Sequence, residues 1–343
     1  QSSFWQLIPS SKEKLAIFII DALRFDLSEY LQSLIEDMID FKIDFLKTLL
    51  PSITEIGMAS LLCKGEELDV SYENENLLIS LQGKRINSKS ERKELLEQYI
   101  GRIGKVVDLV ELSSIDLNKI KILIVLSREI DYIGSFTADL NPQGIFDMMD
   151  KIAKAIKFVA ENDFQQIIVV GDHGFLFAPE GCEPANIPAP SNAMLLKRRF
   201  AVGGQADACW ITESKQVGLR GNLLFAFPEG YAVFSLPGKR EAFFHGGLSL
   251  QECVIPFLSA QARFTRKAVI KMQIPEVISS RILHITVESQ EQELFFPPRK
   301  VKIRVGKYES SIVEISSQKG REEISLIWLG EFDVPPDTVI VQL

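Results

Sequence analysis

Residues 15–26 read LAIFIIDALRFD. The first six, Leu15–Ile20, are all apolar, which predicts a short β-strand buried on both faces. Similar apolar runs lie at residues 41–50, 106–110, 122–126 and 167–170. Helical patterns lie between these runs, at residues 91–100 and, more clearly, at residues 143–160. This alternation predicts an α/β fold with an open, mostly parallel sheet and helices on both faces.

The rest of the chain suggests two additions to this core. Residues 175–190 are rich in Pro, Gly and Ala, and residues 223–236 resemble a hairpin with its turn at Pro228-Glu229-Gly230. From about residue 263, short alternating segments between polar turns predict a small all-β sandwich. We therefore expect a core domain at 1–262, with 175–240 partly an excursion from it, and a β-sandwich domain at 263–343.

Composition limits the classes of function. The 343 residues are 46% hydrophobic and 24% charged, which argues against disorder, and the net charge is −8. A nucleic-acid partner therefore needs a local basic patch or bound metal ions. The four cysteines, Cys63, Cys182, Cys209 and Cys253, are widely spaced, and we expect reduced, mostly buried thiols in a cytoplasmic protein.

No apolar run has the length of a membrane span and no signal peptide is visible, so no membrane partner is expected. Because the chain begins at Gln1 rather than at a methionine, we expect it to be a fragment of a longer protein.

Two oxygen-bearing side chains follow apolar segments. Asp21 comes directly after Leu15–Ile20, where it would serve either as an active-site ligand at a strand end or as the cap of the next helix. Thr54 lies near the expected start of a helix, where a hydroxyl suits both a cap and an activated nucleophile. Ser52 competes with Thr54 for both roles.

Histidine is scarce, with only three in the chain. His173 follows Asp172 directly after an apolar strand, and such a pair can direct two ligands at one metal ion. His245 also follows an apolar stretch, in FFHGG. His284 lies within an alternating strand pattern, and we expect it to be a sheet-surface or packing residue.

Six blocks occur in an order that resembles the PglZ domains of BREX phage-defence systems, which belong to the alkaline phosphatase superfamily. The blocks read LAIFIIDALRFD, LLPSITEIGMASLL, REIDYIG, IIVVGDHGFLF, KRRFAVGG and FFHGGLSLQECVIP. The resemblance extends from about Ile17 to Pro256 and does not include the C-terminal β domain. Six ordered blocks are far more specific than any single motif.

The resemblance implies a centre with two metal ions. The Asp/His ligand set suits zinc, and a carboxylate-rich site would suit manganese nearly as well. One ion would be held by Asp21, Thr54, Asp172 and His173. The second would be held by Asp131, the residue at position 135 and His245. Ser135 departs from the family, which usually has an acidic residue there, so the second ion is in doubt unless Glu129 or Asp139 substitutes.

The resemblance also implies a mechanism in which Thr54 is the nucleophile that attacks phosphorus. Arg24, Lys197, Arg198 and Arg199 are candidates to neutralise the phosphate oxygens. The run at 197–199 would equally suit a solvated basic loop, and Arg24 could face solvent.

We therefore expect a phosphodiesterase or nuclease that acts on nucleic acid or an oligonucleotide, working with other defence proteins. The alternatives are a small-molecule phosphomonoesterase and a non-catalytic scaffold, the second of which Ser135 would favour.

Overall fold

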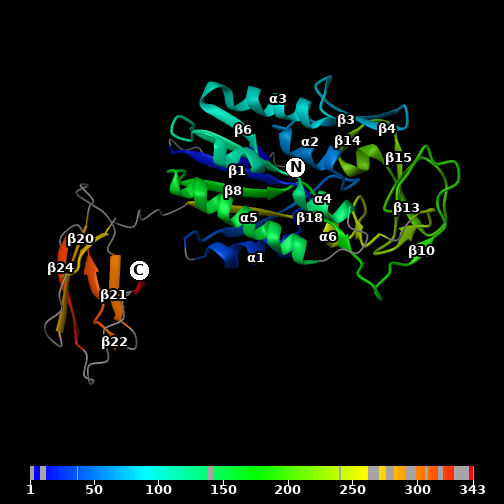
Figure 1. The fold of residues 1–343 in the computed structure, drawn as a ribbon. Coiled ribbons are helices and arrows are strands. Elements are labelled where there is room, and N and C mark those ends of the chain that lie inside the picture. The colour runs from blue at the N-terminus through cyan, green and yellow to red at the C-terminus, as the bar shows by residue number, and fades with distance from the viewer. Residues whose placement is uncertain are drawn as a thin grey trace. The chain divides into compact units, whose positions relative to one another are not determined.

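The structure is a computed structural model that describes residues 4–7, 13–36, 38–136, 142–238, 241–261, 270–275, 282–289, 299–305, 308–315, 320–327 and 340–342. The chain divides into two compact units, Gln1–Arg263 and Phe264–Leu343 (Figure 1). Each unit has its own hydrophobic core.

A six-stranded sheet in the order β2-β18-β8-β1-β7-β6 forms the centre of the first unit (Figure 1). Its strands are β1 (Leu15–Ile20), β2 (Lys42–Lys47), β6 (Gly104–Asp108), β7 (Ile122–Ser127), β8 (Gln166–Gly171) and β18 (Val254–Gln261). β6, β7, β1 and β8 are parallel, and β18 is antiparallel to both β8 and β2. β1 is buried throughout, whereas β2 lies at the sheet edge and is largely exposed. The expectation that residues 41–50 form a buried strand like Leu15–Ile20 is therefore wrong, because an edge strand has only one neighbour.

Helices cover both faces of this sheet, which confirms the predicted fold class. They are α1 (Phe25–Ile35), α2 (Thr54–Leu62), α3 (Lys89–Ile100), α4 (Glu129–Phe136), α5 (Pro142–Glu161) and α6 (Leu250–Cys253). Leu15, Ile17 and Ile19 of β1 share one hydrophobic cluster with residues of α2 and α3. α1 packs on α5, and these two helices lie over the other face (Figure 1). Short 3-10 helices occur at η1 (Phe4–Leu7), η2 (Gly101–Ile103), η3 (Leu109–Ser114) and η4 (Ser214–Val217).

Small sheets extend the first unit beyond the central one. They have the orders β14-β3-β4-β5, β11-β12-β15-β13, β10-β16 and β17-β9. The strands are β3 (Leu68–Glu73), β4 (Asn76–Leu81), β5 (Lys84–Arg85), β9 (Leu176–Phe177), β10 (Asn186–Ile187), β11 (Leu195–Leu196), β12 (Ala201–Val202), β13 (Cys209–Glu213), β14 (Leu219–Arg220), β15 (Leu224–Pro228), β16 (Val233–Phe234) and β17 (Phe243–Phe244). β15 pairs with β12 and β13 while β16 pairs with β10, so the predicted hairpin at 223–236 is wrong.

The second unit contains two antiparallel sheets, β19-β20-β24 and β22-β21-β23, with β25 also paired to β21. The strands are β19 (Ile270–Gln273), β20 (Ile282–Ser289), β21 (Arg299–Val305), β22 (Tyr308–Glu309), β23 (Val313–Ile315), β24 (Arg321–Ile327) and β25 (Ile340–Gln342). Ile285 from one sheet and Ile303 from the other share one buried cluster, which gives the predicted sandwich. His284 lies on an exposed face of β20 beside Glu323, as expected for a sheet-surface residue.

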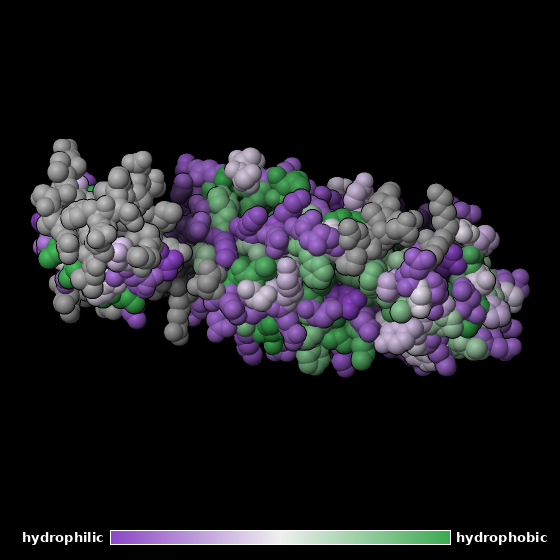
Figure 2. All heavy atoms as spheres, turned by 60° about the horizontal axis from the view of Figure 1, so that its bottom comes forward, coloured by the Kyte–Doolittle hydropathy of each residue, from purple (hydrophilic) through white to green (hydrophobic). Residues whose placement is uncertain are grey.

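On the face shown in Figure 2, hydrophilic and hydrophobic residues are interspersed over the first unit. Among the described residues, no helix is both long and apolar enough to cross a membrane. The four cysteines form no disulfide. Cys182 is exposed and the other three are half-buried, so the expectation of mostly buried thiols is wrong.

Candidate metal centre

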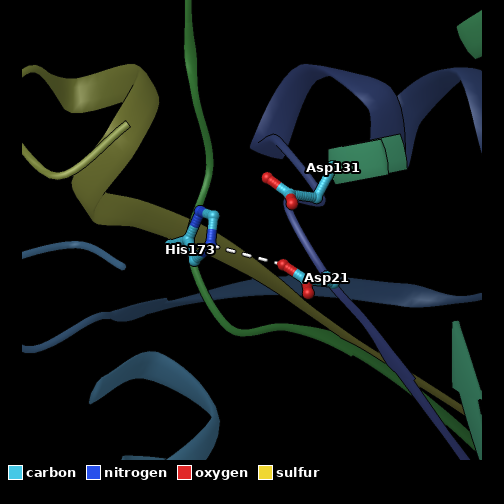
Figure 3. Close-up of side chains that lie close together, drawn as sticks. All are labelled: Asp21, Asp131 and His173. Atoms are coloured by element: carbon cyan, nitrogen blue, oxygen red, sulfur yellow. Dashed lines mark ion pairs between the residues drawn. The ribbon is translucent and has the colours of Figure 1, made fainter. Parts of the chain in front are cut away.

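The carboxyl ends of three neighbouring parallel strands meet at one edge of the central sheet. Asp21 follows β1, the Asp172-His173 pair follows β8, and Asp131 lies in the first turn of α4 after β7. One ligand atom from each of Asp21, Asp131 and His173 lies within 4.8 Å of the others. Their side chains point toward one another (Figure 3). This is the position where open α/β sheets bind their ligands.

The structure distinguishes between the ligand role and the helix-cap role considered for Asp21. Helix α1 begins at Phe25 and its cap position is Arg24, so Asp21 does not cap it. Asp21 is fully buried, and its Oδ1 lies 3.3 Å from Nε2 of His173. Asp21 is therefore available as a candidate ligand.

Thr54 is the first residue of α2, and the cap residue is Ile53. Its Oγ1 donates to Oδ1 of Asp21 at 3.2 Å and lies 3.1 Å from Nε2 of His173. The hydroxyl therefore faces the centre at the positive end of a helix. Ser52 is fully buried, donates to the Gly247 carbonyl and accepts from the Gly246 N–H, so it is neither the cap nor an accessible nucleophile.

The Asp172-His173 pair is fixed by the backbone. Oδ1 of Asp172 accepts from the N–H groups of Ala22 at 3.0 Å and His173 at 2.8 Å, and Oδ2 lies 3.6 Å from Nε2 of His173. Nδ1 of His173 lies 2.9 Å from the Gly174 carbonyl. An Nδ1–H donor to that carbonyl leaves Nε2 as the metal-binding nitrogen.

A second group of donors adjoins the first. Nε2 of His245 lies 3.5 Å from Oδ1 of Asp131, and the His245 ring stacks on His173 with 4.6 Å between centroids. Ser135 belongs to α4, but its side chain lies outside the described residues, as does all of Asp139. Glu129 accepts from Ser127 Oγ and the Arg128 N–H, so it is held at the start of its own helix.

Unpartnered atoms show that these residues fit a cation. Among the residues of this centre, four buried atoms have no hydrogen-bond partner: Oδ2 of Asp21, Oδ1 of Asp131, Oδ2 of Asp172 and Nδ1 of His245. Buried carboxylate oxygens without a donor are costly unless a positive charge compensates them. Carboxylate and imidazole ligands suit zinc, and manganese nearly as well.

The pKa values of these buried groups are shifted because the groups lie close together. Burial and the neighbouring Asp21 charge raise the pKa of Asp131 to about 6 and also raise the pKa of Asp172. Burial alone would lower the pKa of His173, but the Asp172 and Asp21 carboxylates outweigh it and raise the value to about 10. Burial and the charge of His173 lower the pKa of His245 to about 4. In the absence of a metal ion, the raised pKa values mean that protons compensate part of the negative charge of this group.

The four proposed phosphate-binding residues do not lie together. Arg24 pairs with Asp26 at 2.6 Å, and Lys197 and Arg198 line a cavity described below. Arg199 is fully buried and pairs with Glu252 at 2.6 Å, so the expectation that it contacts phosphate is wrong. Glu252 also accepts from the Gly247 N–H at 2.8 Å, so this ion pair supports the loop that follows His245.

Arg128 is a cationic residue that the sequence analysis missed. It is half exposed, and its Nε lies 3.8 Å from Oδ2 of Asp21. It directly follows strand β7, so the strand-end argument used for Asp21 would have identified it. Its guanidinium therefore lies beside the group formed by Asp21, Asp131 and His173.

Two curated proteins resemble the chain in sequence. One is the alkaline phosphatase-like protein BrxZ of Escherichia coli O9:H4 (strain HS), 27% identical over 270 residues, which covers 73% of this chain and 30% of that protein. The other is the alkaline phosphatase-like protein PglZ of Bacillus cereus (strain H3081.97), 21% identical over 323 residues, which covers 88% of this chain and 37% of that protein. The chain thus spans about a third of the length of these relatives.

Solved structures also resemble it. Murine ectonucleotide pyrophosphatase/phosphodiesterase 5 has a TM-score of 0.48 and 12% identity, covering 72% of this chain and 88% of that one. Phosphonoacetate hydrolase from Sinorhizobium meliloti 1021, in complex with phosphonoformate, has a TM-score of 0.45 and 12% identity, covering 72% and 89%. The model of the BREX system PglZ alkaline phosphatase-like domain matches residues 6–260, and the chain therefore belongs to the PglZ family.

Proposed function

We propose that the chain is a metal-dependent phosphodiesterase of the nuclease type, with Thr54 as its nucleophile. The observation that carries the proposal is the position of the Thr54 hydroxyl, between Asp21 at 3.2 Å and His173 at 3.1 Å. The side chain of a helix cap hydrogen-bonds to the backbone of its own helix. Thr54 is instead the first residue of α2, and Ile53 is the cap residue.

Asp21, Thr54, Asp172 and His173 would hold one ion, and Asp131 and His245 would contribute to a second. A bound zinc or manganese ion supplies Lewis-acid chemistry and lowers the pKa of a coordinated hydroxyl. The unpartnered oxygens of the three aspartates support this assignment.

The residues of the chain have separate tasks in this reaction. Oγ1 of Thr54 attacks phosphorus, forming an O–P bond while the bond from phosphorus to the leaving alcohol breaks. Oδ1 of Asp21 is within reach to accept the hydroxyl proton. Arg128 neutralises the non-bridging oxygens. The leaving alcohol takes up a proton. Water then attacks phosphorus, the Oγ1–P bond breaks, a phosphate monoester is released, and a proton from the water restores the Thr54 hydroxyl.

The relatives carry alkaline phosphatase-like names, and the matching family model is of a BREX system domain. These names support a role in phage defence with other defence proteins, and we propose in addition that the chain acts on nucleic acid or an oligonucleotide in the cytoplasm.

The test is metal content together with hydrolysis of bis-p-nitrophenyl phosphate and p-nitrophenyl phosphate after addition of zinc or manganese. We expect bound metal, faster turnover of the diester, and loss of at least about a thousandfold in rate for Thr54→Ala. Thr212→Ala is the matched control, because that hydroxyl bonds to Gln216 away from the centre. Faster turnover of the monoester would indicate a phosphomonoesterase, and metal-free, inactive protein would indicate a scaffold.

A further inference from the structure

A cavity of about 890 Å³ opens beside the metal centre. Ile53 and Glu55, which flank Thr54, line it, as does His245. We call it the side cavity. Because its wall includes the neighbours of the nucleophile, a group attached to a phosphate at Thr54 can extend into it.

The lining of the side cavity includes cations from separate parts of the chain. Arg85 comes from β5, and Lys197 and Arg198 follow β11. Lys197 is exposed, and no ion pair of its side chain occurs within the described part of the chain. Nε of Arg198 lies 3.6 Å from Glu241. Nε of Arg85 lies 3.9 Å from Glu91.

The two arginines are loosely held: besides their ion pairs, Nη1 of Arg198 donates to the Phe234 carbonyl at 3.5 Å. Charge-assisted hydrogen bonds between nitrogen and a carboxylate are typically about 2.7–2.9 Å long. Neither the Arg198 nor the Arg85 contact reaches that length. Arg199, by contrast, is saturated by Glu252 at 2.6 Å. Adjacent arginines therefore differ, with one built into the core and the other facing the cavity.

The remaining lining is mixed. Leu77, Leu195 and Phe200 provide an apolar wall, and Asn76 and Asn87 provide amide groups. Glu55, Glu75 and Glu241 also line the cavity, so it does not attract anions in general. An anion held by Lys197 and Arg198, attached to an apolar ring system that also carries hydrogen-bonding groups, fits this lining. A nucleotide has this chemistry.

We propose that Lys197 and Arg198 bind a second phosphate of the substrate whose scissile phosphate is cleaved at Thr54. The inference rests on the proposed function and names its substrate class, a short single-stranded nucleotide chain with a phosphate beyond the scissile bond. The cavity volume lies within the usual range of about 300–1,000 Å³ for ligand pockets, which suits one or two nucleotides rather than a duplex.

The experiment measures binding separately from turnover. Three thymidine dinucleotides, with a 5′-phosphate, with a 3′-phosphate and with neither, are titrated into zinc-loaded Thr54→Ala protein, which binds without cleaving. We expect one of the two phosphorylated dinucleotides to bind about tenfold more tightly than the dinucleotide without a terminal phosphate.

In Lys197→Ala and Arg198→Gln variants of this protein, the ratio of the two dissociation constants should fall toward one. Lys215→Ala, which truncates an exposed lysine that does not line the cavity, should keep the original ratio. Equal binding of all three dinucleotides, or a preference that survives both substitutions, overturns the proposal.

Hydrolysis of bis-p-nitrophenyl phosphate by the unsubstituted chain tests the proposed function on its own. A phosphate preference without hydrolysis supports the subsite and removes the catalytic assignment. Hydrolysis without a phosphate preference supports the catalytic assignment and removes the subsite.

Discussion

The two carboxylate oxygens of Asp172 differ in their hydrogen bonding. Its Oδ1 is held by two backbone N–H groups, at 3.0 and 2.8 Å, while Oδ2 has no hydrogen-bond partner. The two hydrogen bonds to Oδ1 fix the direction in which Oδ2 points before any metal binds. Such preorganisation lowers the cost of assembling a metal site.

Arg128 is predicted to act on catalysis rather than on metal binding. Arg128→Ala should lower kcat by about a hundredfold or more, the usual effect of removing one donor to a developing negative charge. Arg128→Lys should recover part of the loss, because it keeps the charge but not the planar fork. Zinc affinity should not fall, since the substitution removes a positive charge 3.8 Å from the Asp21 ligand.

The control for Arg128 is Arg220→Ala, which removes an arginine paired with Asp69 outside the centre. Steady-state kinetics and zinc competition with a chelator are the measurements. An unchanged kcat in Arg128→Ala would remove this residue from the mechanism.

Metal binding is predicted to be pH-dependent. The pKa of Asp131 is raised to about 6, that of Asp172 is also raised, and that of His173 is about 10. Metal ligands must be deprotonated, so zinc binding has to displace these protons. Affinity should therefore be weaker at about pH 5.5 than at about pH 7.5, and an unbuffered titration should show proton release.

Asp131→Asn provides the comparison for this prediction. This substitution removes one titrating ligand, so the variant should bind zinc more weakly. It should also lose part of the change in zinc affinity near the Asp131 pKa of about 6. Zinc affinity that does not change with pH would show that these carboxyls are not ligands.

At the residue level, the sequence predicted candidates but not their surroundings. The strand-end rule and the ordered blocks indicated Asp21, Thr54, Asp131, Asp172, His173 and His245, and the structure brings them together. Arg199 was misassigned because its partner Glu252 is 53 residues away. Local sequence records a charge but not whether that charge is buried.

At the scale of elements, α2 depends on a close approach to the strand that bears Asp172. A Cβ added at Gly57 would lie 2.5 Å from the Asp172 carbonyl oxygen, and backbone cannot rotate away. Gly57 is in the same helix as Thr54. The helix therefore keeps Thr54 in its position only while this glycine lacks a side chain.

Gly57→Ala is predicted to impair both stability and turnover. Alanine favours helices over glycine by about 1 kcal/mol, but overpacking costs about 1–3 kcal/mol, so we expect a net loss in the free energy of unfolding. Turnover should fall because α2 must shift. Gly144→Ala in α5 is the control, since its added Cβ would meet Ile133 at 3.4 Å, an ordinary contact. Gly57→Ala protein with normal stability and rate would contradict the packing argument.

Elements were predicted best where the pattern was long and buried. The helix expected at 143–160 occurs as Pro142–Glu161, and Leu15–Ile20 is a strand as predicted. The predicted hairpin at 223–236 is wrong because a turn signal does not specify which strands pair with each other. Both strands pair with segments elsewhere in the chain.

At the scale of the whole molecule, the candidate functional residues described above all lie in one unit. The family match covers residues 6–260, and the metal centre and the side cavity both lie within Gln1–Arg263. The second unit has a separate core that includes Ile285, Ile303 and Ile324. Cooperative folding follows such cores, so the two units should unfold as separate transitions.

A chain that ends at Arg263 should therefore fold, bind zinc and hydrolyse bis-p-nitrophenyl phosphate like the full chain. Calorimetry should show one transition fewer than in the full chain, and metal analysis should show the same zinc content. Phe264–Leu343 expressed alone is the complementary sample, and it should show the circular dichroism of a β-sheet protein without zinc. If the shortened chain aggregates or loses its metal, the second unit supports the centre, and its role is structural rather than that of an independent module.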